Sequence, residues 1–146
     1  MEVNKKIRIG AYGLIIRENK IALIKKARGG YKGLLDIPGG GIEHGESPEE
    51  TLIREIKEEA GADVLNYELL DVKSNRIVWH DEIFNEDLHQ IGILYKVELK
   101  DYNLKESGDG LDSDGCSFYD IDKLSKNDIT PFTLEGLRLL GFKVSK

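Results

Sequence analysis

The stretch 39–61 constrains the fold of this chain more than any other, because it carries both a start and a stop signal for a helix. Ser47 can cap the first turn, Pro48 suits the first helical position, and Glu50 stands three residues after the cap. Gly61 can adopt the left-handed conformation that ends a helix. The pattern predicts one helix between these signals, preceded by a glycine-rich loop.

On this helix, expected over 48–60, the side chains separate into two stripes at about 100° per residue. An apolar stripe should face a core and comprises Leu52, Ile56 and Ala60. An acidic stripe lies beside it and comprises Glu55, Glu58 and Glu59. Like charges at these spacings repel each other by about 0.2–0.5 kcal/mol per exposed pair. A solvated acidic surface is the ordinary explanation, but hard divalent cations also favour clustered carboxylates together with backbone carbonyls. The glycines at 39–41 have no Cβ and can bring such carbonyls close.

The whole segment resembles the Nudix box, in which glycines, an Arg-Glu pair and a Glu-Glu pair recur at set spacings. The matching residues are Gly40, Glu46, Arg54, Glu55, Ile56, Glu58, Glu59 and Gly61. The final position of the motif is Ala62, which is smaller than the usual aliphatic residue but leaves every polar position intact. On these residues the chain is identified as a small, MutT-like member of the Nudix hydrolase family.

The resemblance implies metal-dependent hydrolysis of a pyrophosphate bond in a nucleoside diphosphate linked to another moiety, with water attacking phosphorus. A nucleoside triphosphate, an oxidised nucleotide or ADP-ribose would each fit this description. The resemblance assigns Mg²⁺ or Mn²⁺ to four ligands, namely Glu55, Glu58, Glu59 and the Gly39 carbonyl. Glu55 is alternatively the base that takes a proton from the attacking water. Arg54 and Glu46 complete the expected catalytic set by pairing with each other or with a box carboxylate.

Two other functions share this fold. A Nudix-fold nucleotide-binding or sensing module without catalysis usually carries a degraded box, and the box in this chain is intact. An enzyme similar to isopentenyl-diphosphate isomerase would use a cysteine. Cys116 is the single cysteine of the chain, and its polar context does not resemble the motif of that family.

The residues that contact the nucleotide are less constrained by pattern. Aromatic rings can stack on a base and arginines can pair with phosphate, which makes Arg28, Tyr31 and Trp79 candidates for substrate binding. Further aromatic residues and a further arginine, each more often structural, are Tyr12, Phe84, Tyr119 and Arg76. Family members often add a carboxylate from a loop that follows the central strands. The acids of that region are Glu106, Asp109, Asp112 and Asp114. Asp114 is placed four residues before an aromatic residue, which resembles the family, and it joins the candidates for substrate binding.

Length and charge limit the partners of the chain. With 146 residues it is expected to form one domain, 1–146, large enough to bury a core. The net charge of −6 argues against a surface that coats nucleic acid. A single cysteine fits a reducing, cytoplasmic location, and neither a membrane-spanning stretch nor a signal sequence is expected. A small nucleotide is the expected partner, and the sequence leaves open whether the chain forms a homodimer.

Outside the box, strands are predicted at 7–17, 21–25, 34–37, 64–72, 76–79, 91–99 and 116–119. The first two form a hairpin around a turn at 18–19, and loops are predicted at 27–32, 81–87 and 105–115. A second capped helix follows Thr130 and ends before Gly141. Strands that mix with two helices predict an α/β or α+β layered domain. The resemblance sharpens this prediction to an α/β/α sandwich with a mixed β-sheet between helices.

Overall fold

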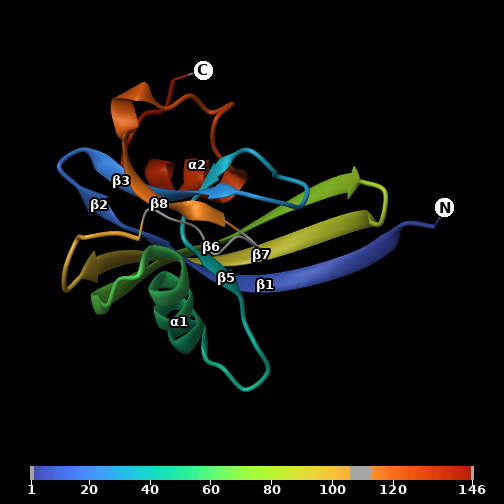
Figure 1. The fold of residues 1–146 in the computed structure, drawn as a ribbon, viewed down its shortest axis with the longest axis horizontal. Helices are drawn as coiled ribbons and strands as arrows, with labels where there is room; N and C mark the ends of the chain where they lie inside the picture. The colour runs from blue at the N-terminus through green and yellow to red at the C-terminus, as the bar shows by residue number, and fades with distance from the viewer. Residues whose placement is uncertain (1, 106–112, 146) are drawn as a thin grey trace.

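The computed structural model describes residues 2–105 and 113–145, and it places the secondary-structure elements around two β-sheets (Figure 1). The strands are β1 (Asn4–Leu14), β2 (Ile16–Arg17), β3 (Lys20–Lys26), β4 (Leu35–Asp36), β5 (Gly39–Gly41), β6 (Val64–His80), β7 (Asn85–Leu99) and β8 (Ser113–Asp120). The helices are α1 (Pro48–Ala60) and α2 (Pro131–Leu139), with a short 3₁₀ helix, η1 (Ile121–Lys123), between β8 and α2.

The larger sheet is mixed and has the strand order β5-β1-β7-β6. Strand β1 runs parallel to β7 and antiparallel to β5, and β6 runs antiparallel to β7. The smaller sheet is antiparallel and joins β2, β3 and β4, with β8 paired to the other side of β3. Helix α1 covers one face of the mixed sheet, while α2 and the smaller sheet lie on the opposite face (Figure 1). The predicted mixed sheet between helices is therefore confirmed, and the second sheet is an addition to it.

Two hydrophobic cores correspond to these two faces. The core under α1 combines Leu52 and Ile56 with Tyr95 and Val97 of β7. The core on the other side contains Leu94, the β7 residue that precedes Tyr95, together with residues of α2. Side chains on a strand alternate between faces, so β7 is buried on both sides around Leu94 and Tyr95, while Lys96 and Glu98 further along the strand are exposed.

The predicted start and stop of the box helix are confirmed. Ser47 Oγ accepts a hydrogen bond from the Glu50 N–H at 3.2 Å, and the Glu50 carboxylate accepts one from the Ser47 N–H at 2.9 Å. The helix ends at Gly61, which has φ 67° in the left-handed region. Thr130 likewise caps α2, as predicted. Local signals fixed both helix boundaries because these bonds join residues close in sequence.

Strand boundaries differ more from the sequence predictions. The glycines at 39–41 form strand β5 instead of a loop, because their backbone pairs with β1. The predicted strand 7–17 divides at Ile15, so that β1 and β2 belong to different sheets. The predicted strands 64–72 and 76–79 are one continuous strand, and residues 85–87 belong to β7 instead of a loop. In each case pairing with a distant strand decided the outcome.

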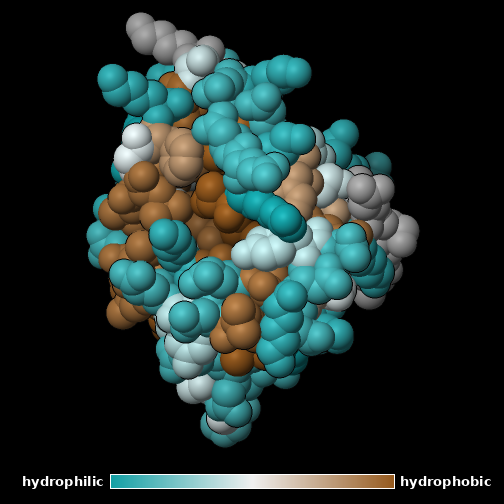
Figure 2. Space-filling model, turned by 90° about the vertical axis from the view of Figure 1, so that its left-hand side faces the viewer, coloured by the Kyte–Doolittle hydropathy of each residue, from teal (hydrophilic) through white to brown (hydrophobic). Residues whose placement is uncertain are grey.

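Figure 2 shows hydrophobic residues gathered on the end of the molecule where β6 begins. Strand β6 is an edge strand of the mixed sheet, and it leaves Leu65, Tyr67 and Leu69 exposed. A homodimer stays a prediction. Within residues 2–105 and 113–145, no helix combines the length and the apolar character needed to cross a membrane.

Candidate active site

The acidic stripe of α1 meets the free edge of strand β5. The Gly39 N–H donates a hydrogen bond to Glu59 Oε1 at 2.8 Å, and Glu59 is only 6% exposed. Since the N–H and C=O of one strand residue point to the same side, the Gly39 carbonyl also lies on this free edge. The backbone oxygen that the sequence proposed as a metal ligand is thus directed away from the sheet, on the same side as Glu59.

Two glycines make this approach possible. Gly39 has φ 152°, and a Cβ built on it would lie 2.3 Å from the Ala11 carbonyl oxygen of β1. A Cβ built on Gly40 would lie 2.7 Å from the carboxyl carbon of Glu55. Strand β5 therefore forms a cradle without side chains, in which the backbone touches β1 on one side and the Glu55 carboxylate on another.

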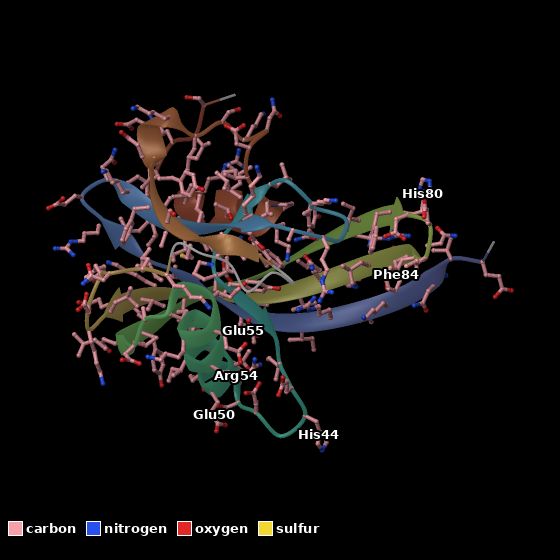
Figure 3. All side chains as sticks on the ribbon, in the orientation of Figure 1. His44, Glu50, Arg54, Glu55, His80 and Phe84 are labelled. Carbon is pink, nitrogen blue, oxygen red and sulfur yellow. The ribbon has the colours of Figure 1, made fainter. Side chains whose placement is uncertain are left out.

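Arg54 ties the carboxylates to the loop that precedes the helix. Its Nε and Nη2 donate to Glu46 Oε2 and Oε1 at 2.8 and 2.9 Å, and its Nη1 donates to Glu55 Oε1 at 2.8 Å. The same guanidinium reaches the Gly41 carbonyl at 3.3 Å and Glu58 at 3.5 Å. The sequence expected Arg54 to pair with Glu46 or with a box carboxylate, and the guanidinium does both. Figure 3 shows Arg54 and Glu55 on α1, while His44 lies at the tip of the preceding loop.

The electrostatics differ among the acids of the site. The hydrogen bonds from Arg54 lower the pKa of Glu46 to about 2. The pKa of Glu59 is raised to about 8, mainly by burial and also by the charges of Glu55 and Asp36, against the lowering effect of the Gly39 N–H. Burial also raises the pKa of Glu55, against the effect of Arg54. Two desolvated carboxylates beside each other therefore favour the arrival of positive charge at this edge.

The donor set suits a hard divalent cation. It consists of carboxylate oxygens and a backbone carbonyl, which Mg²⁺ and Mn²⁺ prefer. Among the described residues, no three His, Cys, Asp or Glu side chains are already gathered into an arrangement that could hold a metal ion. Arg54 accounts for this, because it engages Glu55 and Glu58, and Glu58 is 57% exposed in its side chain. The buried Glu59 and the cradle at Gly40 fit the cation that the sequence predicted.

A cavity of about 380 Å³ lies on the face of the mixed sheet that α1 does not cover. Its lining residues are Lys6, Arg8, Lys26, Arg28, Gly29, Gly30, Tyr31, Trp79, Asp81, Phe84, Glu86, Leu88 and Gln90. The cavity brings together Arg28, Tyr31 and Trp79, which the sequence had selected as substrate contacts. Arg8 connects it to the acidic site, because a Cβ on Gly41 would lie 3.0 Å from Arg8 Nε.

Sequence reasoning missed the cations of strand β1. Lys6 and Arg8 alternate with Ile7 and Ile9, so the two basic side chains share one face of the strand and line the cavity. The alternation was visible in the sequence, but nothing local indicates that this face borders a cavity. Lys26, at the end of β3, lowers the pKa of Glu59 and was missed for the same reason.

Several other candidates lie outside the cavity. Tyr12 is buried in the second core and packs on Phe132 with a ring-centroid distance of 5.1 Å. Tyr119 packs against the same core, and Arg76 forms a bidentate ion pair with Asp87. Of the acids expected at 106–114, the structure does not describe Glu106, Asp109 and Asp112, nor the side chain of Asp114.

Cys116 lies in the core under α1 and is fully buried. Burial raises the pKa of its thiol to about 12, so a reactive thiolate is disfavoured at neutral pH. This position does not suit the cysteine chemistry of the isomerase alternative.

Comparison with known proteins agrees with the fold and with the box. A family model described as NUDIX domain matches residues 6–140. An ADP-ribose pyrophosphatase of Methanocaldococcus jannaschii is 34% identical over 114 residues, which are 78% of this chain and 62% of that protein. An 8-oxo-dGTP diphosphatase of Proteus vulgaris is 35% identical over 68 residues, which are 46% of this chain and 61% of that protein. The chain thus spans about three fifths of the length of these curated relatives.

Solved structures support the same fold. The crystal structure of a MutT NUDIX hydrolase from Burkholderia pseudomallei superposes with a TM-score of 0.76 at 24% identity, covering 92% of this chain and 98% of that one. A mutator MutT protein from Bacillus halodurans gives a TM-score of 0.70 at 21% identity, covering 94% of this chain and 85% of that one.

Proposed function

Because the chain belongs to the NUDIX domain family, we propose that it is a metal-dependent pyrophosphohydrolase acting on a nucleoside diphosphate linked to another moiety. The observation that carries the proposal is the meeting of two desolvated carboxylates with a glycine strand. Glu59 is anchored on the Gly39 N–H at 2.8 Å, and Glu55 lies against Gly40. A purely structural helix–strand contact would be served as well by apolar side chains, without the cost of burying charge.

On this proposal Glu55, Glu58, Glu59 and the Gly39 carbonyl hold Mg²⁺ or Mn²⁺. When bound, the cation supplies positive charge against the phosphoryl oxygens on which charge develops during hydrolysis. Glu59 is positioned by the backbone of β5, through the Gly39 N–H. Glu55 either completes the ligand set or accepts the proton of the attacking water, and its raised pKa suits the second role.

Arg54 and Glu46 act by positioning. The bidentate pair holds the preceding loop on the first turns of α1, and the remaining Arg54 nitrogen orients Glu55. Partners of this kind typically change metal affinity or activity about 10- to 100-fold when they are removed. Arg54→Lys keeps the charge but loses the planar fork, so it should weaken the site without unfolding the protein.

The substrate enters from the cavity. Arg8 and Lys26 stand at the end of the cavity nearest to the carboxylates, as their electrostatic effects on Glu55 and Glu59 indicate. In a chain with a net charge of −6, these bases give a phosphate chain a local attraction beside the acidic helix. The relatives named above are an ADP-ribose pyrophosphatase and an 8-oxo-dGTP diphosphatase, and both act on nucleotides.

The test is hydrolysis of a panel of nucleoside triphosphates, nucleotide sugars and dinucleotides with Mg²⁺, scored for phosphate, pyrophosphate and mononucleotide. Wild-type protein should release product from at least one substrate, and Glu59→Gln should lower its kcat by 100-fold or more. Glu135→Gln on α2 is the matched control, because within the described part of the chain Glu135 forms surface ion pairs with Lys73 and Arg138, away from the acidic edge. Tight nucleotide binding with no turnover by the wild type would instead support the sensing alternative.

A further inference from the structure

Tyr12 of β1 carries a hydroxyl group that makes no hydrogen bond within residues 2–105 and 113–145. Its side chain is only 5% exposed, and its ring packs on Phe132 in the second core. A phenylalanine would fill the same space without the cost of taking a polar group out of water. Because most buried polar groups in proteins are hydrogen-bonded, this hydroxyl group calls for an explanation.

Two glycines direct the Tyr12 ring along β1. A Cβ built on Gly10 would lie 2.8 Å from both Tyr12 Cε2 and the hydroxyl oxygen, so the outer part of the ring lies over Gly10. A Cβ built on Gly39 would lie 2.6 Å from Tyr12 Cδ1, so the inner part of the ring needs the glycine of the neighbouring strand β5 (Figure 1). The ring therefore runs from position 12 toward Arg8, and its hydroxyl group points to the part of β1 that lines the cavity.

Arg8 approaches the same place from the other direction. Residues 8, 10 and 12 share one face of β1, because side chains on a strand alternate. Gly10 pairs with Gly41 of β5, and a Cβ built on Gly41 would lie 3.0 Å from Arg8 Nε. The Cβ positions of paired strand residues are about 5 Å apart. The Tyr12 hydroxyl and the Arg8 guanidinium thus flank one glycine pair, Gly10 and Gly41.

Both flanking groups are hydrogen-bond donors at neutral pH. The pKa of Tyr12 is raised mainly by burial and also by nearby carboxylates, Asp36 first among them, against the lowering effect of Arg8. The hydroxyl group therefore keeps its proton, and a guanidinium has donors only. In the part of the chain that the structure describes, Arg8 also forms no hydrogen bond and no ion pair. Two donors without acceptors suit an anion that carries several oxygen atoms.

The glycine pair lies next to the carboxylates of α1. Glu55 lies against Gly40, the neighbour of Gly41 in β5. The charge of Arg8 lowers the pKa of Glu55, so the guanidinium is within electrostatic range of that carboxylate as well as of the hydroxyl group. A ligand with two linked phosphoryl groups could therefore place one at the carboxylates and the other at the glycine pair.

We propose that the Tyr12 hydroxyl is a substrate-binding group that, together with Arg8, donates hydrogen bonds to one phosphoryl group of the diphosphate at the glycine pair. This inference rests on the proposed function and adds a contact to the same site. The contact forms when the substrate binds and persists in the transition state. Its loss should consequently raise KM more than it lowers kcat.

The first experiment titrates inorganic pyrophosphate into the full-length protein in Mg²⁺ by isothermal calorimetry. Tyr12→Phe should raise the Kd at least 10-fold, and Tyr119→Phe should leave it within about 2-fold. Tyr119 is the matched control, because it packs against the same core but does not line the cavity. Unchanged binding by Tyr12→Phe, or no binding of pyrophosphate by the wild type, would overturn the inference.

The double variant of Tyr12→Phe with Arg8→Met tests whether the two donors hold the same group. Its loss of pyrophosphate affinity should be smaller than the product of the two single losses, because removal of one donor loosens the phosphoryl group that the other holds. A loss equal to that product would place the donors on separate groups and contradict the shared contact.

The second experiment separates a binding role from a structural one. Tyr12→Phe keeps the ring, so its free energy of unfolding in urea should be unchanged or higher. With the panel substrate that the wild type hydrolyses, KM should rise at least 10-fold while kcat stays within about 3-fold. Lower stability with an unchanged KM would show that the hydroxyl group is structural and would refute the inference. If the wild type hydrolyses no member of the panel, the proposed function fails, and the pyrophosphate titration still decides the role of Tyr12.

Discussion

Replacement of Gly40 by alanine tests most directly whether strand β5 is shaped to receive the Glu55 carboxylate. A Cβ at this position would lie 2.7 Å from the carboxyl carbon, whereas ordinary contact begins at 3.4 Å. The carboxylate must therefore move by about 0.7 Å, the difference between 3.4 and 2.7 Å. The obstructing atoms end a flexible side chain, and Gly40 has an ordinary strand backbone, so the fold can adapt at little cost.

A displacement approaching 1 Å of a reacting or positioning group can lower a rate about 100-fold. We therefore expect Gly40→Ala to lower kcat/KM for pyrophosphate hydrolysis by about 10- to 100-fold, equivalent to about 1.4–2.7 kcal/mol of transition-state stabilisation. The free energy of unfolding should change by less than about 1 kcal/mol. Steady-state phosphate release and urea denaturation monitored by circular dichroism measure the two quantities on the same preparation.

Gly39→Ala provides the contrast. Its Cβ would lie 2.3 Å from a backbone oxygen, in a region of φ that alanine rarely adopts, so this variant should lose stability as well as activity. In a Glu55→Asp background, where the carboxylate is withdrawn by one methylene, Gly40→Ala should cost less activity than in the wild type. Full activity of Gly40→Ala, or a loss of stability equal to that of Gly39→Ala, would refute the reasoning.

Three further outcomes are expected. Thr133→Val removes the acceptor of the buried Ile37 N–H at 3.1 Å and should lower the free energy of unfolding by about 1–3 kcal/mol, measured in urea. Burial raises the pKa of Asp36 above its ordinary value of 3.8. Between that value and the pKa in the folded protein, the folded protein keeps a proton that the unfolded chain loses, so the free energy of unfolding falls as the pH rises through this range. Asp36→Asn, which can still accept from the Thr130 hydroxyl, should abolish this fall in melting curves recorded from pH 4 to pH 7. Mg²⁺ at about 100 times its Kd should stabilise the wild type by about 2.7 kcal/mol and Glu59→Gln much less, measured by thermal shift.

Each of these has a clear contrary result. Thr133→Ser should retain most of the stability, and a loss equal to that of Thr133→Val would show that the methyl packing matters more than the hydroxyl. Parallel pH profiles for wild type and Asp36→Asn would show that the buried carboxyl does not govern the pH dependence. An unchanged melting curve of the wild type in millimolar Mg²⁺ or Mn²⁺ would remove the metal site from the proposal.

The box helix was predictable because its signals are local. The capping bonds of Ser47 and Glu50, the left-handed stop at Gly61 and the pairing of Arg54 with Glu46 all join residues at most eight positions apart. Such bonds form whenever the helix forms, whatever surrounds it. Residue types and spacing were therefore sufficient to place the acids on one helix face, and the resemblance to the Nudix box supplied the chemistry proposed for them.

The environment of those acids depended on distant parts of the chain. The glycines at 39–41 look like a loop until β1 is available to pair with them, and Glu59 becomes a desolvated group only when α1 packs against that new edge. The cavity likewise joins β1, the loop after β3 and the end of β6, which are far apart in sequence. Strand register and the packing of the two sheets brought Lys6 and Trp79 to one cavity. Hydrogen bonds between distant strands and the burial of apolar side chains determine the register and the packing, and no short segment of the chain contains that information.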